Sequence, residues 1–322
     1  MTPMRFEAEY GSLWTALAEQ VAEAQQGKAV DAALLAARYR RVCENLALAQ
    51  SRAYPVHLIS RLESLAQDAH QLIYRRQDYG LRALGQLLRV DLPRAVRAEW
   101  RLVLVALALF VLPLALAFGL SLAGPDFPLR VLDARQLREF ETMYGDGKAH
   151  VGRLREAATD WHMFGYYIVN NIGIGFRTFG AGILAGIGSA FVLVFNGLFM
   201  GVITGHLTRV DLGHNLWPFI ATHSSFELTG IVLSGAAGLR MGLGWLAPGR
   251  LRRLDALRAS ARAAVPLVYA AFFLLVVAAA FEAFWSPAAW VAPWVKYSVA
   301  AVCWTLVLLW LLLMGRGGAR AR

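Results

Sequence analysis

A glycine-rich, apolar stretch between residues 164 and 242 contains the side chains of this chain that are best suited to chemistry. They are Asn170, Asn171, Arg177, Asn196, His206, His214, His223 and Glu227. A lipid bilayer offers polar groups no water, so each of them needs a protein partner or a water-filled cavity. We therefore treat this stretch as the candidate functional site.

The pair His223 and Glu227 has the most informative spacing, because residues four apart share one face of a helix. Three interpretations are open. The two side chains form a hydrogen-bonded pair that fixes helix packing, or they relay protons or coordinate an ion in a transport path. In the third interpretation they bind a metal, with His206 or His214 as a further ligand.

Hydrolytic chemistry finds little support in these residues. The HExxH motif of zinc proteases is absent. Ser224 and Ser225 follow His223, but no GxSxG-like context for a nucleophile surrounds them. We predict a protein that is not an enzyme, with no catalytic residue and no cofactor.

Two adjacent asparagines, Asn170 and Asn171, point about 100° apart on a helix and cannot serve one packing face. They suit a broken or capped helix end, where side-chain amides satisfy loose backbone groups. Asn196, followed by a glycine, has the same potential. Arg177 either extends to the inner headgroups or pairs with Glu227.

Glycines recur at one-turn spacing in the same stretch, which lets helices approach closely. Such contacts lie inside the monomer or form a homodimer interface. The residues concerned are Gly182, Gly186, Gly197, Gly201 and Gly205.

The elements that position these residues are membrane helices. Hydrophobic residues make up 57% of the chain and charged residues 17%, against about 45–50% and 25% in soluble domains. Residues 102–123, 264–285 and 291–314 are long enough to span a bilayer, which takes about 20 residues. We predict an all-α, polytopic integral membrane protein.

The glycine-rich stretch supplies the remaining spans. We expect a short segment at 161–174, a helix at 176–207 and a helix at 216–239. The short segment either crosses the membrane or is re-entrant, so the prediction is six transmembrane helices, or five.

Topology follows from the positive charges, since arginines flank the spans and favour the cytoplasmic side. They lie before the first span, in the segment 247–263, and in the tail 315–322. The segment 125–160 is then an external loop, and both termini are cytoplasmic. The net charge of +10 is explained in this way, and we predict no nucleic-acid partner.

Three parts follow along the chain. Residues 1–98 carry apolar residues at helical spacing and predict a cytoplasmic bundle of four amphipathic helices. Residues 99–314 form the transmembrane domain, and a basic cytoplasmic tail covers 315–322.

In order and spacing, these motifs resemble the core of the stage II sporulation protein M family (SpoIIM, also called DUF95). The N-terminal part is similar to the longer Gram-negative members. The core motifs are Asn170-Asn171 to Phe176, Gly180 to Gly188, Asn196-Gly197 to Gly201, and His223 to Glu227; the N-terminal ones are Tyr39 to Ala49, Leu62 to Tyr74, and Leu92 to Arg97.

The resemblance implies a bacterial inner-membrane protein that acts as a component or scaffold of an envelope-associated complex. It also implies partners such as RDD-domain membrane proteins and a MoxR-type ATPase system. The apolar spans add the lipid bilayer as a partner, and the glycine spacing adds a second copy of the chain. The alternative is a transporter or channel that uses the Asn/His/Glu core as a path for a proton, an ion or a small molecule.

Overall fold

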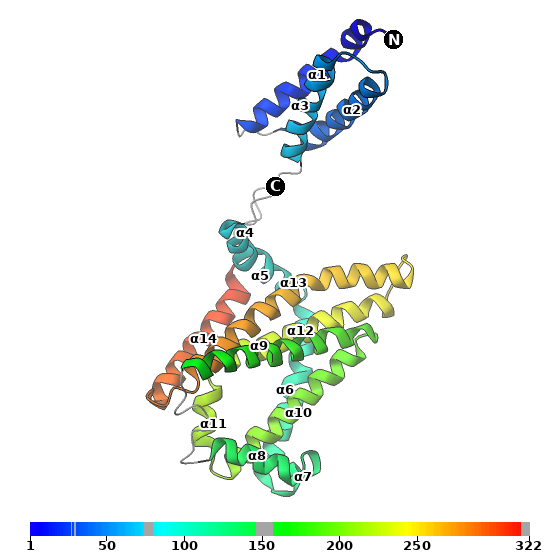
Figure 1. Ribbon diagram of the computed structural model, residues 1–322. Helices are drawn as coiled ribbons and strands as arrows, with labels where there is room; N and C mark the ends of the chain where they lie inside the picture. Colours follow the sequence, from blue (N-terminus) through cyan, green and yellow to red (C-terminus); the bar gives the residue numbers. More distant parts are fainter. Residues whose placement is uncertain (27, 29, 74–79, 146–156, 317–322) are drawn as a thin grey trace. The chain divides into compact units, whose positions relative to one another are not determined.

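The computed structural model describes residues 1–26, 28, 30–73, 80–145 and 157–316, and every regular element in these ranges is a helix (Figure 1). The all-α prediction is confirmed for this part of the chain. The chain divides into two compact units, Met1–Ala83 and Leu84–Arg322. Each unit is described by itself.

The first unit packs three helices around one apolar core. They are α1 (Pro3–Gln25), α2 (Ala32–Ser51) and α3 (Val56–Ile73). The core centres on side chains that are at most 1% exposed: Phe6, Trp14, Leu17, Val42, Leu58 and Leu62. Asp31 begins α2, because its side chain accepts hydrogen bonds from the backbone N–H groups of Ala33 and Leu34.

Short helices at the start of the second unit contact the last described helix, and the first of them spans the boundary between the two units. They are α4 (Leu81–Gln86), a π-helical turn at Leu87–Asp91 and α5 (Leu92–Ala98). Trp310 Nε1 donates to the carbonyl oxygen of Leu88 at 2.7 Å. Residues 84–98 therefore pack with the second unit, whereas the sequence grouped them with the N-terminal helices.

Four described helices are long and apolar enough to cross a membrane: α6 (Trp100–Ala123), α10 (Ile187–Arg209), α13 (Arg253–Ala280) continued by a π-helical turn to Trp285, and α14 (Pro293–Leu313). Three of them cover the spans expected at 102–123, 264–285 and 291–314. Helix α13 begins earlier than expected, so part of the basic segment 247–263 is helical. A total of five or six spans stays a prediction.

Helix α9 (Ala157–Gly180) and helix α12 (Ser224–Leu246) complete the helical core. Helix α12 packs along α13, and α9 contacts both of them (Figure 1). The sequence placed a break near residue 175, but α9 continues through it. The break falls at the 3-10 turn Ala181–Ile183 and at Gly186, whose φ of +81° favours glycine.

The predicted glycine contacts are present, and their partners lie in the same chain. Gly197, Gly201 and Gly205 form a buried stripe on α10 that meets the backbone of α6; a Cβ at any of them would overlap a carbonyl oxygen there. Gly182 meets α12 in the same way, because a Cβ there would overlap the carbonyl oxygen of Gly238. Gly186 lies in ordinary contact with Leu239 and Gly242 of α12. Of the two alternatives, the structure places these glycines in packing within the monomer.

Three shorter helices cover the end of α10: α7 (Asp126–Val131), α8 (Ala134–Tyr144) and α11 (Gly213–Ile220). A capping box begins α8, in which Asp133 and Gln136 exchange side-chain and backbone hydrogen bonds. Part of the expected external loop at 125–160 lies outside the described residues.

Candidate functional site

Three ionisable side chains from two helices converge at the start of α12. His223 directly precedes this helix and Glu227 lies in its first turn. Glu282 comes from the π-helical turn Phe281–Trp285 that ends the α13 span. One ligand atom from each of the three lies within 4.8 Å of the others, and His223 Nε2 is 3.7 Å from Glu227 Oε2. We call these three residues the polar core.

Neighbouring polar groups hold the polar core in place. His223 Nδ1 and Ser286 Oγ share a hydrogen bond of 2.9 Å. Asn171 Nδ2 donates to Glu282 Oε2 at 3.2 Å, and Asn170 Nδ2 donates to Asn171 Oδ1 at 3.1 Å. Helix α9 thereby fixes one carboxylate, and the loop after α13 fixes the imidazole.

The polar core combines a buried imidazole with two partly buried carboxylates. His223 is 4% exposed and Asn171 is 1% exposed. The ring of Phe219 stands edge-on to the His223 ring, with 5.6 Å between centroids. Burial, and then the nearby carboxylate of Glu282, raises the pKa of the Tyr144 hydroxyl, so this group stays protonated beside the core. Electrostatic interactions are strengthened in such an environment.

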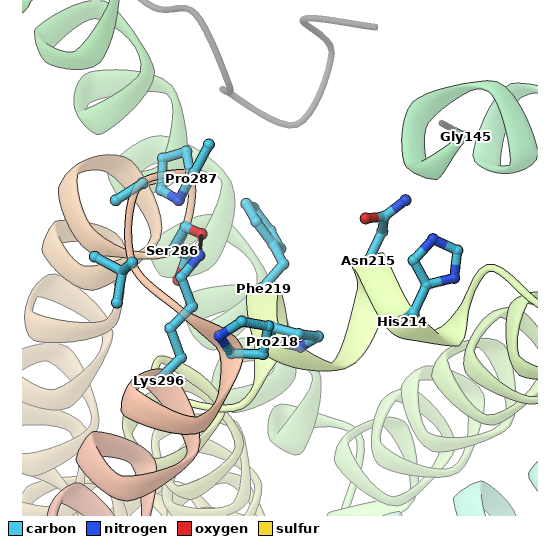
Figure 2. A pocket seen from close by; sticks show the side chains of 12 residues that line it. Gly145, His214, Asn215, Pro218, Phe219, Ser286, Pro287 and Lys296 are labelled. Carbon is cyan, nitrogen blue, oxygen red and sulfur yellow. Dashed lines mark hydrogen bonds between the residues drawn. The ribbon is translucent and has the colours of Figure 1, made fainter. Parts of the chain in front are cut away.

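Figure 2 shows a pocket of about 380 Å³ whose wall includes Ser286, the hydrogen-bond partner of His223. Its wall includes Phe219 from α11, Ser286 from the loop after α13 and Lys296 from α14. Lys296 Nζ donates to the carbonyl oxygen of Ser286 at 2.6 Å, and its side chain is buried. Ser286 therefore stands between His223 and the pocket, so one hydrogen bond links the pocket to the polar core.

The opposite side of the polar core is apolar. Buried aliphatic side chains follow Glu227 along α12 and precede Glu282 along α13: Ile231, Val232, Leu233, Leu274 and Leu275. Farther along α12, Arg240 Nε donates to Glu99 Oε1 at 2.7 Å. The polar core thus adjoins a pocket on one side and an apolar layer on the other.

The asparagines lie differently from their expected positions, and of the two alternatives for Arg177 the pairing with Glu227 is not formed. Asn170 and Asn171 are inside α9 and not at a helix end, because their amides find side-chain partners instead of loose backbone groups. Arg177 is exposed and donates to Gly173 O at 3.1 Å in its own helix, rather than pairing with Glu227. Asn196 likewise donates to Val192 O at 2.7 Å inside α10.

The two other candidate histidines, His206 and His214, lie apart from His223. His206 Nε2 is 2.7 Å from Glu141 Oε1, which joins α10 to α8. His214 Nδ1 is 2.7 Å from the carbonyl oxygen of Asp211. Among the described residues, the group with metal-ligating geometry is His223, Glu227 and Glu282, so neither His206 nor His214 joins it as the sequence suggested.

Glu282, Ser286 and Lys296 were missed by sequence reasoning. Glu282 and Lys296 lie within runs that we interpreted as plain spans. A carboxylate or an ammonium group in such a run is itself a signal, because charges in a membrane span are costly and usually functional. That signal would have identified both residues, although not their position next to His223.

Comparison with known families gives two matches. The family model described as Stage II sporulation protein M matches residues 100–287, which is more than half of the chain. A domain of unknown function (DUF8413) matches residues 4–75, within the first unit. Searches of curated proteins and of solved structures found no significant match.

Proposed function

We propose that this chain, which belongs to the Stage II sporulation protein M family, is a membrane carrier whose polar core binds and passes a proton or a small cation. The family resemblance noted in the sequence is confirmed by the match, but the match does not specify an activity. One observation carries the proposal: His223, Glu227 and Glu282 converge in a buried position beside a pocket.

The proposal includes a topology in the bacterial inner membrane. Six crossings, by α6, α9, α10, α12, α13 and α14, return the chain to the side from which it started. Both termini are then cytoplasmic, in agreement with the arginines that precede α6 and follow α14. In this topology the polar core and its pocket lie toward the external face.

The cost of burying charge favours a transport role over a purely structural one. An unpaired charge in an apolar interior costs several kcal/mol, so packing alone favours apolar residues of the same volume. The pocket on one side and the apolar layer on the other are typical of a binding site reached from one face at a time. An open channel would need polar groups along the whole path.

Flux measurements test the carrier. Purified full-length protein is reconstituted into liposomes that contain a pH-sensitive or a sodium-sensitive dye, and an imposed proton or sodium gradient is followed with time. We expect flux of one of these cations above that of empty liposomes and a loss of at least tenfold in E227Q and E282Q, which keep the side-chain volume. Glu141→Gln, in α8, is the matched control and retains flux. Flux equal to that of empty liposomes for both cations contradicts the proposal.

A scaffold or complex component is the second candidate function, and the first unit supports it. Met1–Ala83 has its own core and its own family match, as expected of a module for binding partners. The family resemblance suggests RDD-domain membrane proteins and a MoxR-type ATPase system.

Deletion of the first unit tests the scaffold role. Cells express the full chain or residues 84–322, and tagged protein is purified with its membrane partners after crosslinking. Loss of the same partners on deletion, with unchanged partners in E282Q, supports a scaffold whose binding does not depend on the polar core. Unchanged partners on deletion contradict it.

A further inference from the structure

We infer that His223, Glu227 and Glu282 bind a divalent transition metal ion of the zinc or manganese class. The donor set is one imidazole nitrogen and two carboxylates. These donors suit Zn²⁺ and Mn²⁺, whereas Ca²⁺ and Mg²⁺ prefer oxygen ligands alone. The inference deepens the proposed function, because it names the class of cation held at the same residues.

The distances are close to those of a bound site. Two ligands bonded to one ion at about 2.1 Å lie at most about 4.2 Å apart. The His223 and Glu227 atoms already lie 3.7 Å apart, and all three ligand atoms lie within 4.8 Å. The set therefore needs a contraction of at most about 0.6 Å to reach the distances of a bound ion.

The outer shell points to a ligand independently of the cluster itself. In metal sites a ligating histidine commonly uses its other ring nitrogen in a hydrogen bond, which fixes its orientation. His223 follows this pattern, because the Ser286 contact at Nδ1 leaves Nε2 facing Glu227. Asn171 supports Glu282 in the same manner at 3.2 Å. Buried polar groups therefore orient two of the three ligands through hydrogen bonds.

An entry path is the remaining requirement of a metal site. The pocket of about 380 Å³ ends at Ser286, which contacts His223 directly. It is large enough for a hydrated ion, and its wall carries the side chains of His214 and Asn215 (Figure 2). The pocket therefore brings an ion to Ser286, one residue from the polar core, past a wall that is partly polar.

Metal titration of the full chain tests the inference. Protein in lipid nanodiscs is stripped with a chelator and titrated with Zn²⁺ by calorimetry, with Mn²⁺ binding followed by electron paramagnetic resonance. Elemental analysis then gives the stoichiometry. We expect one ion per chain and an affinity loss of at least about tenfold in H223Q, E227Q and E282Q, with a loss of about tenfold in S286A from its outer-shell role.

Matched controls separate this site from incidental binding. His206→Gln and Glu141→Gln disrupt another His–Glu pair of the same chain and are expected to leave affinity unchanged. Thermal unfolding of each variant confirms that it is folded. Absence of saturable binding, or equal loss in the His206 and His223 variants, overturns the inference.

Flux and binding together separate this inference from the proposed function. Binding of one metal ion per chain with no flux of any cation supports the metal site and contradicts the carrier. Proton flux without metal binding supports the carrier and contradicts the metal site.

Discussion

The α6–α10 contact and the polar core hold helices together by different means. At the α6–α10 contact, Gly197, Gly201 and Gly205 remove side chains so that two backbones meet. At the polar core, side chains from α9, α12 and the end of α13 meet through hydrogen bonds and charge. The α6–α10 contact is therefore sensitive to added side-chain volume. The polar core is sensitive to the loss of hydrogen-bonding or charged groups.

This difference suggests a division of labour within the second unit. Close glycine packing gives a rigid pair of helices with little polar character. The polar core is placed where helices end or widen into a π-helical turn, a feature that often marks functional sites. Stability and chemistry are therefore expected to respond to different substitutions.

The largest effect is expected for Gly201→Leu at the α6–α10 contact. A side chain there overlaps the carbonyl oxygen of Leu114, so the two helices must separate. We expect a loss of about 3 kcal/mol or more, at the upper end of overpacking, measured by thermal unfolding in detergent. The control is Gly119→Leu on exposed α6, where nothing lies within 4 Å of an added Cβ. Equal effects of the two variants would show that the contact is not close.

His223→Ala is expected to have the next largest effect on stability. It removes a buried ring and leaves Ser286 without its partner, at a cost of about 2–3 kcal/mol. Thermal unfolding is the measurement, and exposed His162→Ala is the matched control. A fully stable H223A protein that has lost flux would argue against a structural role for this histidine.

Asn171→Ala tests the support of Glu282 from α9. Losing a hydrogen bond to a charged group costs about 1.5–3 kcal/mol, and we expect the lower end because Glu282 is only partly buried. The neighbouring Asn170→Ala, an exposed position, is expected to cost less than half as much in the same unfolding assay. The reverse order would mean that Asn170 carries the contact.

The smallest effect is expected for Asn196→Ala. Its amide donates to Val192 O in its own helix, whose carbonyl already serves the α10 ladder. Alanine favours the helix by a few tenths of a kcal/mol, so stability should change by less than about 0.5 kcal/mol. A loss above about 1.5 kcal/mol, together with a change of oligomeric state in light scattering, would instead place Asn196 in a contact between copies.

Particular residues show how far the sequence alone could lead. His223 and Glu227 were placed on one face because the α-helical period is fixed, and the structure has them 3.7 Å apart. Asn170 and Asn171 were expected at a helix break, but tertiary partners allow α9 to continue through them. Glu282 was missed because nothing local links residue 282 to residue 223.

The sequence by itself determined the helical class, the apolar spans and the glycine spacing, because each depends on local period and composition. Only the tertiary structure decided which helix each glycine meets and which polar groups converge. The α10 glycines face α6 rather than a second copy. The polar core joins residues separated by more than fifty positions, and such contacts follow from how helices cross, which no local pattern encodes.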